Sequence, residues 1–504
     1  MARARRREGR PGGGARPHLE KRRSAVAAPG VRAGDILELE TNDVALDGDA
    51  LGRRGDYVIF VDGAAPGDRL RVQVLSANRK FARARIVEVL RPSPHRVAPR
   101  CRHFGVCGGC AWQHIAYAEQ LRWKQKLVAS LLRSALGDAA PEVLETIGVE
   151  GSGAVADPAA PWGFRNKAHF VLGPGRGGAS LSLGHYRKGS KEIIAVEECP
   201  VHPDAANRIA FRIRDALERY SVPGTDERTL RGSARHVVVR TSPGSTETQA
   251  TVVAGRGDSR RLHAALREVA TGRQAPDGLH LNLHTEPGPF IFGKETQRLQ
   301  GAARIRQHVG GFTFLLSPRS FFQTSLGAAE KLLEVVLAGV PVDDPRPVLD
   351  LYAGTGLFAI PLARRGHRVM AVEENPDAVA DAVASLRENG VHPSACRIAR
   401  ARVEDWLRRA CREDLDGEDP PFGAVVLDPP REGCPEEALA RILKRLKPAR
   451  VVYVSCNPRA LADDLRIARR LGWRAETVQP IDMFPHTAHV EAVAWLAPSK
   501  LSRA

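Results

Sequence analysis

The chain has 504 residues, enough for about three domains of roughly 150 residues each. It is 43% hydrophobic and 26% charged, a globular balance that excludes collagen-like, coiled-coil and wholly disordered chains. No apolar run approaches the roughly 18 residues that cross a bilayer, and the arginine-rich start lacks an apolar signal segment. We therefore expect a cytoplasmic protein with no membrane partner, and no obligate protein partner is evident.

The charge favours a polyanionic partner. Lys and Arg number 75 against 58 Asp and Glu, a formal net charge of +17. About half of this excess lies in residues 1–32, where ten basic residues face two glutamates. Residues 1–30 have few large apolar side chains, so we expect a disordered basic tail that either tethers RNA or has no specific role.

Short β-branched segments separated by turns come next. Four or five strands at this spacing predict a small β-barrel over residues 31–92, either of the oligonucleotide-binding kind or another small barrel. Its basic residues, such as Arg53, Arg83 and Arg85, either face phosphates or are simply solvated. The expected strands lie at residues 35–40, 56–61, 68–74 and 81–89.

Three of the eight cysteines, Cys101, Cys107 and Cys110, are crowded into one glycine-bearing loop. The other cysteine before residue 396 is Cys199. One compact loop with a distant fourth thiol favours a [4Fe-4S] cluster over zinc, because zinc ribbons usually have two C-x2-C knuckles. Zinc and unligated thiols remain the alternatives.

The pattern then changes twice. Apolar residues at helical spacing predict a helix over residues 117–136, and strand-rich segments follow to about residue 320. Beyond that point strands alternate with helices, which is typical of a doubly wound parallel sheet. We expect an α/β protein with a central α+β domain at 93–315 and a Rossmann-like domain at 316–504. Strands of the latter are expected at residues 348–351, 369–373, 424–427 and 451–455.

The first of these strands runs into Asp350-Leu-Tyr-Ala-Gly354-Thr-Gly356, and the second ends at Glu373. Glycines at such a turn let a nucleoside approach the backbone, and an acid ending the second strand can accept both ribose hydroxyls. A nicotinamide dinucleotide fits this pattern too. Asp350 favours S-adenosylmethionine, because a carboxylate there can meet a cationic aminoacyl group.

Two more motifs follow parallel strands, Asp428-Pro-Pro-Arg431 and Ser455-Cys456-Asn-Pro458. We expect both at the carboxyl edge of the sheet, where doubly wound folds bind ligands. Cys456 is there either a nucleophile or a small core residue. Glu491 follows a run of polar and aromatic residues and is either a functional carboxylate or a solvated strand residue.

Eight segments carry a resemblance to one family. They are Cys101–Cys110 with Gln113, Phe164–Lys167, Phe292–Glu295, Ser320–Gln323, Asp350–Gly356, Asp428–Arg431, Ser455–Pro458 and His486–Glu491. Together they closely resemble the RNA 5-methyluridine methyltransferases, and specifically the iron–sulfur, TRAM-domain branch that modifies 23S ribosomal RNA. The resemblance runs from about residue 31 to the C-terminus.

The resemblance implies roles for individual residues. Residues 31–92 would be the TRAM barrel, Cys456 the nucleophile and Glu491 the base. Two positions depart from the family pattern: Leu357 replaces a polar residue that touches the cofactor in many relatives, and Arg402 replaces an acid or amide near the adenine. The cluster ligands would be Cys101, Cys107, Cys110 and Cys199, and the methyl-donor site would hold Gln323, Tyr352, Glu373 and Asp428 beside the Gly354 and Gly356 turn.

The implied reaction is transfer of a methyl group from S-adenosylmethionine to carbon 5 of a uridine in RNA. Carbon 5 is too weak a nucleophile on its own, and addition of the Cys456 thiolate at carbon 6 would activate it. The uridine would have to be flipped out of a helix or lie in a loop. We expect 23S ribosomal RNA as substrate; the alternatives are a transfer RNA uridine, an iron–sulfur nicotinamide oxidoreductase and a catalytically silent RNA-binding factor.

Overall fold

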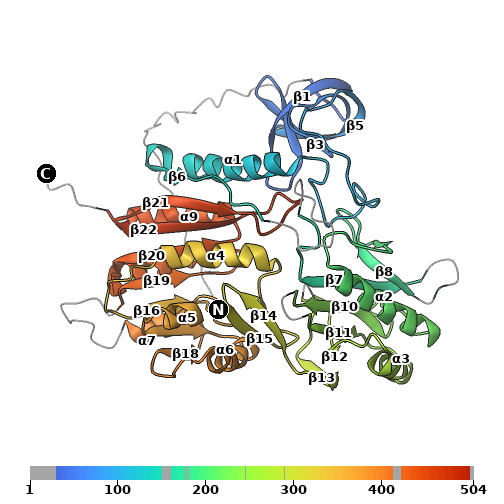
Figure 1. Ribbon diagram of the computed structural model, residues 1–504. Helices are drawn as coiled ribbons and strands as arrows, with labels where there is room; N and C mark the ends of the chain where they lie inside the picture. Colours follow the sequence, from blue (N-terminus) through green and yellow to red (C-terminus); the bar gives the residue numbers. More distant parts are fainter. Residues whose placement is uncertain are drawn as a thin grey trace, which may run out of the picture.

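The computed structural model describes residues 30–149, 161–175, 179, 181–243, 246–288, 290–411 and 422–499. The predicted basic tail, apart from Gly30, therefore lies outside the described residues. Figure 1 places a small barrel at the top, a large sheet with its helices at the left and a second sheet at the lower right. No helix in the described part of the chain is long and apolar enough to cross a membrane.

The barrel is closed by five strands in the order β1-β2-β3-β5-β4, which confirms the predicted small barrel. Tyr57, Ile59 and Val61 of β3 point into its core, as the alternation of apolar residues requires. Part of its positive charge is used internally, since Arg83 forms an ion pair of 2.8 Å with Asp49. The strands are β1 (Ile36–Val44), β2 (Ala50–Arg54), β3 (Tyr57–Asp62), β4 (Arg69–Ala77) and β5 (Phe81–Arg91).

Helix α1 (Tyr117–Leu136) has the bounds that its apolar periodicity predicts, and it ends at Gly137 with a φ of 60°. Its buried residues, among them Val128 and Leu132, pack in one core with the C-terminal sheet. After a 3₁₀ turn (Gly137–Ala139), strand β6 (Glu142–Val143) pairs with the edge of the same sheet. We therefore propose that this segment, which the expected boundaries group with the central domain, belongs to the C-terminal unit.

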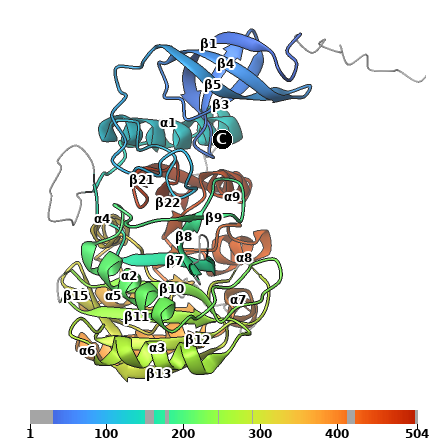
Figure 2. The ribbon, with the colours of Figure 1, turned by 90° about the vertical axis from the view of Figure 1, so that its right-hand side faces the viewer.

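The central domain is a seven-stranded sheet in the order β13-β12-β11-β10-β7-β8-β9. Helices α2 and α3 cover one face, as Figure 2 shows, and contact Ala168, Phe170 and Leu172 of β7. The alternate residues of β7, which include Lys167 and His169, point to the other face, which carries no helix. The elements are β7 (Lys167–Pro174), β8 (Leu181–Tyr186), β9 (Ile193–Ala195), α2 (Asp204–Arg219), β10 (Ala234–Thr241), β11 (Thr248–Ala254), α3 (Ser259–Thr271), β12 (Gly278–Leu283) and β13 (Glu295–Gly301).

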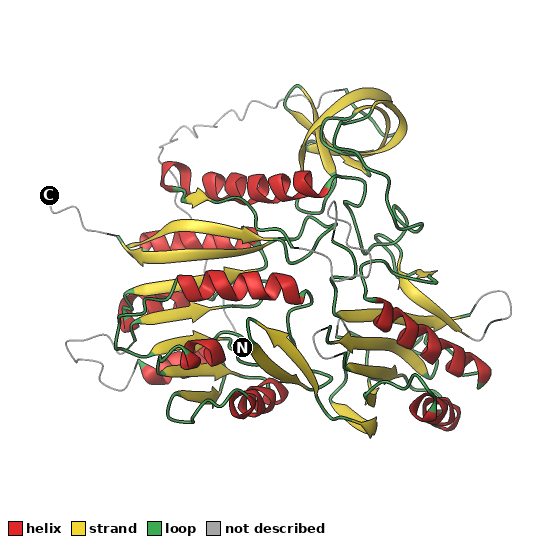
Figure 3. Ribbon diagram, in the orientation of Figure 1, coloured by secondary structure: helices red, strands yellow, loops and turns green. Residues whose placement is uncertain are grey.

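The C-terminal sheet has the order β18-β17-β16-β19-β20-β22-β21-β6, and its strands from β18 to β20 are parallel. Helices cover both faces (Figure 3): α4, α5 and α6 with the hairpin β14–β15 on one, and α1, α7, α8 and α9 on the other. This confirms the predicted α/β class. The strands are β14 (Ile305–Val309), β15 (Phe312–Leu316), β16 (Val348–Leu351), β17 (Val369–Glu373), β18 (Cys396–Arg400), β19 (Ala424–Leu427), β20 (Arg450–Ser455), β21 (Trp473–Ile481) and β22 (Glu491–Pro498).

Strand β16 lies between β17 and β19, so the winding direction reverses there and opens a crevice at the carboxyl ends of the strands. The antiparallel strand β22 sits between β20 and β21 and brings its first residue, Glu491, to the same edge. The helices are α4 (Leu326–Ala338), α5 (Ala359–Arg364), α6 (Pro376–Glu388), α7 (Val403–Ala410), α8 (Glu436–Ala440), which continues as a π-helical turn (Arg441–Leu446), and α9 (Pro458–Arg470).

Candidate active site

The turn after β16 is the first part of the site. Tyr352, Gly354 and Gly356 all have positive φ angles, of 61°, 55° and 87°. A Cβ at Gly356 would also lie 3.2 Å from the side chain of Ile360, which would have to shift slightly. The turn therefore needs glycine at two positions and holds Tyr352 in a conformation that costs free energy.

Glu373 ends β17 beside this turn. Its carboxylate accepts hydrogen bonds from the backbone N–H groups of Gly354, at 2.8 Å, and Asn375, at 2.7 Å. Gln323 is buried just before α4, and its neighbour Thr324 accepts a 2.8 Å hydrogen bond from the N–H of Asn166. Three of the four predicted segments therefore meet at the switch point of the sheet, since Glu373 is bonded to the turn and the N–H of Asp428 donates to the carbonyl of Leu351 at 3.4 Å. Gln323 lies on the fourth segment, before α4.

The two departures from the family pattern have different surroundings. The guanidinium of Arg402 lies 3.6 Å from the carboxylate of Glu404 and 4.0 Å from that of Glu374. Glu404 also accepts a 2.9 Å hydrogen bond from the hydroxyl of Tyr352. Glu404 thus supplies an acid two residues beyond Arg402, and sequence reasoning missed it. Leu357, the other departure, is buried in the apolar core, and its side chain offers no polar group.

Three carboxylates line this edge, the buried Asp350 and Glu491 and the half-buried Asp428. Desolvation and the charge of Asp428 raise the pKa of Asp350 well above its usual range, and no described side chain donates a hydrogen bond to it. Desolvation raises the pKa of Asp428 to about 7. Arg431 acts on Glu491, but no described cation forms an ion pair with Asp350 or Asp428, so this edge is suited to a positively charged ligand.

Cys456 directly follows β20, and Glu491 is the first residue of β22, the antiparallel neighbour of that strand. The last aligned pair of the ladder is Ser455 with Ala492, so each of the two residues lies one position beyond it, and the charge of Glu491 acts on the thiol. Burial and the charge of Glu491 raise the pKa of the Cys456 thiol to about 11, while Arg431 opposes that shift. Burial and Asp428 raise the pKa of Glu491 well above its usual range. The Cys456 thiol is therefore protonated at neutral pH in the free protein.

The loop before Glu491 is fixed through His486, whose φ is 64°. The carbonyl of His486 accepts hydrogen bonds of 2.9 Å from the N–H groups of both Ala111 and Trp112, next to the cysteine loop. Its own N–H donates to the side chain of Gln120 at 2.9 Å, and its ring stacks on Trp162 with 4.1 Å between centroids. One residue thus links this loop to the cysteine loop, to α1 and to the segment before β7.

A buried ion pair fixes the other end of this loop. Lys124 of α1 donates to the carboxylate of Asp482 and, at 3.0 Å, to the carbonyl of Phe484. Both charged side chains are fully buried. The sequence held a signal that Lys124 is buried, since it falls on the apolar stripe of a helix between Leu121 and Val128, but no pattern identified Asp482 as its partner.

The four predicted metal-ligating cysteines line one cavity of about 140 Å³ between the cysteine loop and the central sheet. Burial raises the pKa of Cys110 to about 11 and that of Cys199 to about 12, and neighbouring thiols add to both shifts. The loop is braced by the side chain of Gln113, which accepts a 3.1 Å hydrogen bond from the N–H of Cys101. Four half-buried thiols in one cavity could bind a metal centre that stabilises their deprotonated forms.

Sequence reasoning missed two histidines in this cavity. Among the described residues, His185, Cys199 and His202 form the one group of three potential ligands whose donor atoms lie within 4.8 Å of one another. A single zinc ion with Zn–S bonds of about 2.3 Å would need thiols about 3.8 Å apart in tetrahedral geometry. The cysteines are thus more widely spaced than one zinc ion requires, which suits a larger cluster.

Comparisons with known proteins agree with this geometry. The sequence profile of the tRNA (uracil-5-)-methyltransferase family matches residues 304–499, and that of the TRAM domain matches residues 31–87. An uncharacterized RNA methyltransferase of Halalkalibacterium halodurans is 32% identical over 476 residues, which cover 92% of this chain and 98% of that protein. One of Thermosynechococcus vestitus is 33% identical over 92% of this chain and 99% of its own length.

A solved structure matches the whole fold. It is the tRNA (uracil-54, C5)-methyltransferase of Pyrococcus abyssi in complex with S-adenosyl-L-homocysteine, with a TM-score of 0.69 and 26% identity over 91% of this chain and 99% of that one. The doubly wound sheet with its glycine turn therefore defines a class of enzyme, the S-adenosylmethionine-dependent methyltransferases. Within that class the chain belongs to the RNA (uracil-5-)-methyltransferase family, which confirms the resemblance seen in its motifs.

The raised pKa of Cys456 predicts its reactivity. Only the thiolate reacts with iodoacetamide, so alkylation of Cys456 should be slow at about pH 7 and rise about tenfold per pH unit up to about pH 10. Glu491→Gln removes a negative charge and should speed alkylation at about pH 8, whereas Arg431→Leu should slow it. Mass spectrometry of the Cys456 peptide measures the rates, with buried Cys434 as internal control. Equal rates in all three proteins would contradict this electrostatic description.

Proposed function

We propose that this enzyme methylates carbon 5 of a uridine in 23S ribosomal RNA, with Cys456 as nucleophile and Glu491 as base. The main support is the proximity of Cys456 and Glu491 at the adjoining ends of β20 and β22, where the charges of Glu491 and Asp428 both raise the pKa of the thiol. Asp428 also interacts with Asp350 on the methyl-donor side, so the two halves of the site share one acidic group. A nicotinamide oxidoreductase would leave the cysteine–glutamate pair without a use.

The reaction begins at the thiol of Cys456, which releases its proton to solvent when the substrate binds, and the resulting thiolate adds to carbon 6 of uracil. Electron density then moves to carbon 5, which takes the methyl group from S-adenosylmethionine, leaving S-adenosylhomocysteine. Glu491 removes the proton from carbon 5, and the Cys456 thiolate leaves carbon 6 to give 5-methyluridine. The high pKa of Glu491 helps here, because a more basic carboxylate is a better proton acceptor.

S-adenosylmethionine supplies an electrophilic methyl group on a sulfonium. The residues of this chain suit such a cation, because desolvation raises the pKa of both Asp350 and Asp428 and, among the described residues, no cation forms an ion pair with either. Glu373, with the turn of Gly354 and Gly356, would hold the ribose, Tyr352 would contact the cofactor beside this turn, and Gln323 would contact it from the segment before α4. The exposed Phe321, two residues before Gln323, offers a ring on which a base can stack.

Transfer RNA is the second candidate substrate, favoured by the likeness to the Pyrococcus abyssi enzyme. A strain that lacks the gene would lose 5-methyluridine at the target, and sequencing of modified nucleotides in ribosomal and transfer RNA identifies it. The wild-type gene should restore the modification, and Cys456→Ala should not. Loss confined to transfer RNA would overturn the ribosomal assignment, and restoration by Cys456→Ala would overturn the nucleophile.

We also propose that Cys101, Cys107, Cys110 and Cys199 bind a [4Fe-4S] cluster. The support is their shared cavity and a spacing wider than one zinc ion requires. Methyl transfer moves no net electrons, so the role proposed for these thiols is structural. Through Ala111 and Trp112 they would hold the carbonyl of His486 and, with it, the loop that leads to Glu491.

Protein purified without oxygen should be brown and contain about four irons per chain. Cys199→Ser should lose the iron and speed hydrogen exchange at residues 484–490, because the cysteine loop no longer holds His486. Cys411→Ser, which changes a thiol outside the cavity, should keep the iron and the slow exchange. One zinc and no iron per chain would refute the cluster and point to the group of His185, Cys199 and His202 instead.

A further inference from the structure

Two segments without a role in the proposed reaction, Phe164–Lys167 and Phe292–Glu295, carry cations. They adjoin the face of the central sheet that α2 and α3 do not cover. Lys167 of β7 and Arg240 of β10 are direct partners in an antiparallel pair, so their side chains emerge side by side. Like charges in this position destabilise a sheet. Within the described part of the chain neither side chain forms an ion pair, which leaves this cost without an internal compensation.

Arg240 is 1% exposed. Its guanidinium donates to the carbonyl of Ser320, but its Nε and one Nη have no hydrogen-bond partner. The nearest acid is Asp381, whose carboxylate already accepts from Arg304, Ser317 and Ser320. A buried guanidinium with unused donors is costly unless an anion meets it.

Lys167 connects this pair to the second segment. Its ammonium lies 5.4 Å from the centre of the Phe292 ring and makes no described hydrogen bond. Burial, together with Arg240 and Arg165, lowers its pKa well below the usual value. Its own sequence motif, Phe164–Lys167, thus meets the motif Phe292–Glu295 in space, although about 125 residues separate them.

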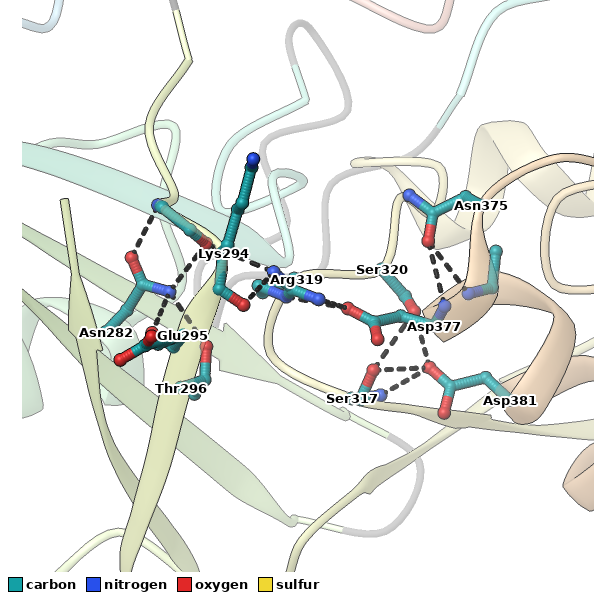
Figure 4. Close-up of polar contacts among 12 residues, drawn as sticks. Asn282, Lys294, Glu295, Thr296, Ser317, Arg319, Ser320, Asn375, Asp377 and Asp381 are labelled. Atoms are coloured by element: carbon teal, nitrogen blue, oxygen red, sulfur yellow. Dashed lines mark hydrogen bonds and ion pairs between the residues drawn. The ribbon is translucent and has the colours of Figure 1, made fainter. Parts of the chain in front are cut away.

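The second segment presents another free cation, Lys294. Asn282 holds the backbone on both sides, donating to the carbonyls of Gly293 at 3.0 Å and Glu295 at 2.8 Å. Arg319 donates to the carbonyl of Lys294 and forms an ion pair of 2.6 Å with Asp377. Figure 4 shows the Lys294 side chain leaving this network with its ammonium directed away from every residue drawn. The main chain is thus fixed while the charge is left exposed.

The cations also lie close to the candidate active site. The segment before β7 stacks Trp162 on His486, at one end of the catalytic loop. The same segment reaches Lys167 three residues after Phe164. Between these two residues, the N–H of Asn166 donates a hydrogen bond to the carbonyl of Thr324, the neighbour of Gln323. A ligand held by Lys167 would therefore lie beside the groups proposed to handle uracil and the methyl donor.

We propose that Lys167 and Lys294, backed by the buried charge of Arg240, form a phosphate-binding site that holds a backbone phosphodiester of the RNA next to the target uridine. This inference rests on the proposed function and deepens it. A phosphodiester at the two lysines would neutralise the like charges across the β7–β10 pair without having to reach the buried guanidinium. Contacts to phosphate fix the register of a nucleic acid without reading its sequence, which suits a site that must present one extruded base.

The test measures RNA binding, without turnover, as a function of salt. Lys294→Gln and Lys167→Met should each weaken binding of a substrate RNA and reduce the slope of log K against log salt by about one. The affinity for S-adenosylhomocysteine, measured by calorimetry, should not change. Arg261→Gln, an equal loss of charge on the outward side of α3, is the control and should keep the wild-type slope.

Stability gives an independent readout. Because Lys167→Met removes one of two adjacent like charges, the free variant should melt at the same temperature as the wild type or higher. Unchanged salt slopes in both variants, or a fall in S-adenosylhomocysteine affinity in place of RNA affinity, would overturn the proposal; the latter would assign the cations to the cofactor carboxylate. Since binding is scored without methylation, a protein that binds RNA with the expected slopes but never methylates it would refute the proposed function and leave this site standing.

Discussion

The carbonyl of His486, held by the N–H groups of Ala111 and Trp112, is the junction on which the arrangement of the molecule depends. The indole of Trp112 also donates to the carbonyl of Gly48, so the barrel is joined to the same point at 2.9 Å. α1 reaches it through Gln120 and the central domain through the ring of Trp162. A backbone with a positive φ is sustained only when its surroundings over-determine it, and here four parts of the chain do so. The geometry of the edge that ends in Glu491 therefore depends on contacts made by all of them.

The electrostatics of the site follow from burying like charges together. Asp428 raises the pKa of both Asp350 and Glu491, and Glu491 raises that of Cys456. On the central sheet the adjacent charges are positive, since Lys167 and Arg240 are neighbours on paired strands. No described acid forms an ion pair with either. Both arrangements cost stability in the free protein and favour ligands of the opposite charge. A cationic cofactor has the charge that suits the acidic edge, and an anionic nucleic acid has the charge that suits the basic pair.

Much of this could be predicted from the sequence where the signal was local. Strands buried on both faces appear as short β-branched runs, and these predicted the strands at 348–351, 369–373 and 424–427. A helix buried along one stripe shows helical periodicity, which predicted the helix at 117–136. The short strand β6 and its parallel pairing with β21 leave no such pattern, since two residues carry no period. The ion pair of Lys124 with Asp482 and the meeting of Lys167 with Phe292 were also out of reach, because their partners are far apart in sequence and only the packing of domains brings them together.

The covalent step at Cys456 is the central claim, and a trapped adduct tests it most directly. RNA carrying 5-fluorouridine at the target should react with the wild-type enzyme and S-adenosylmethionine to give a complex that resists denaturant, because fluorine replaces the proton that must leave. Glu491→Gln should trap unmodified RNA in the same way, since addition and methyl transfer occur but proton removal does not. Mass spectrometry after digestion should then find the methylated nucleotide on the peptide that contains Cys456. An adduct on another residue, or turnover of unmodified RNA by Glu491→Gln at the wild-type rate, would contradict the account.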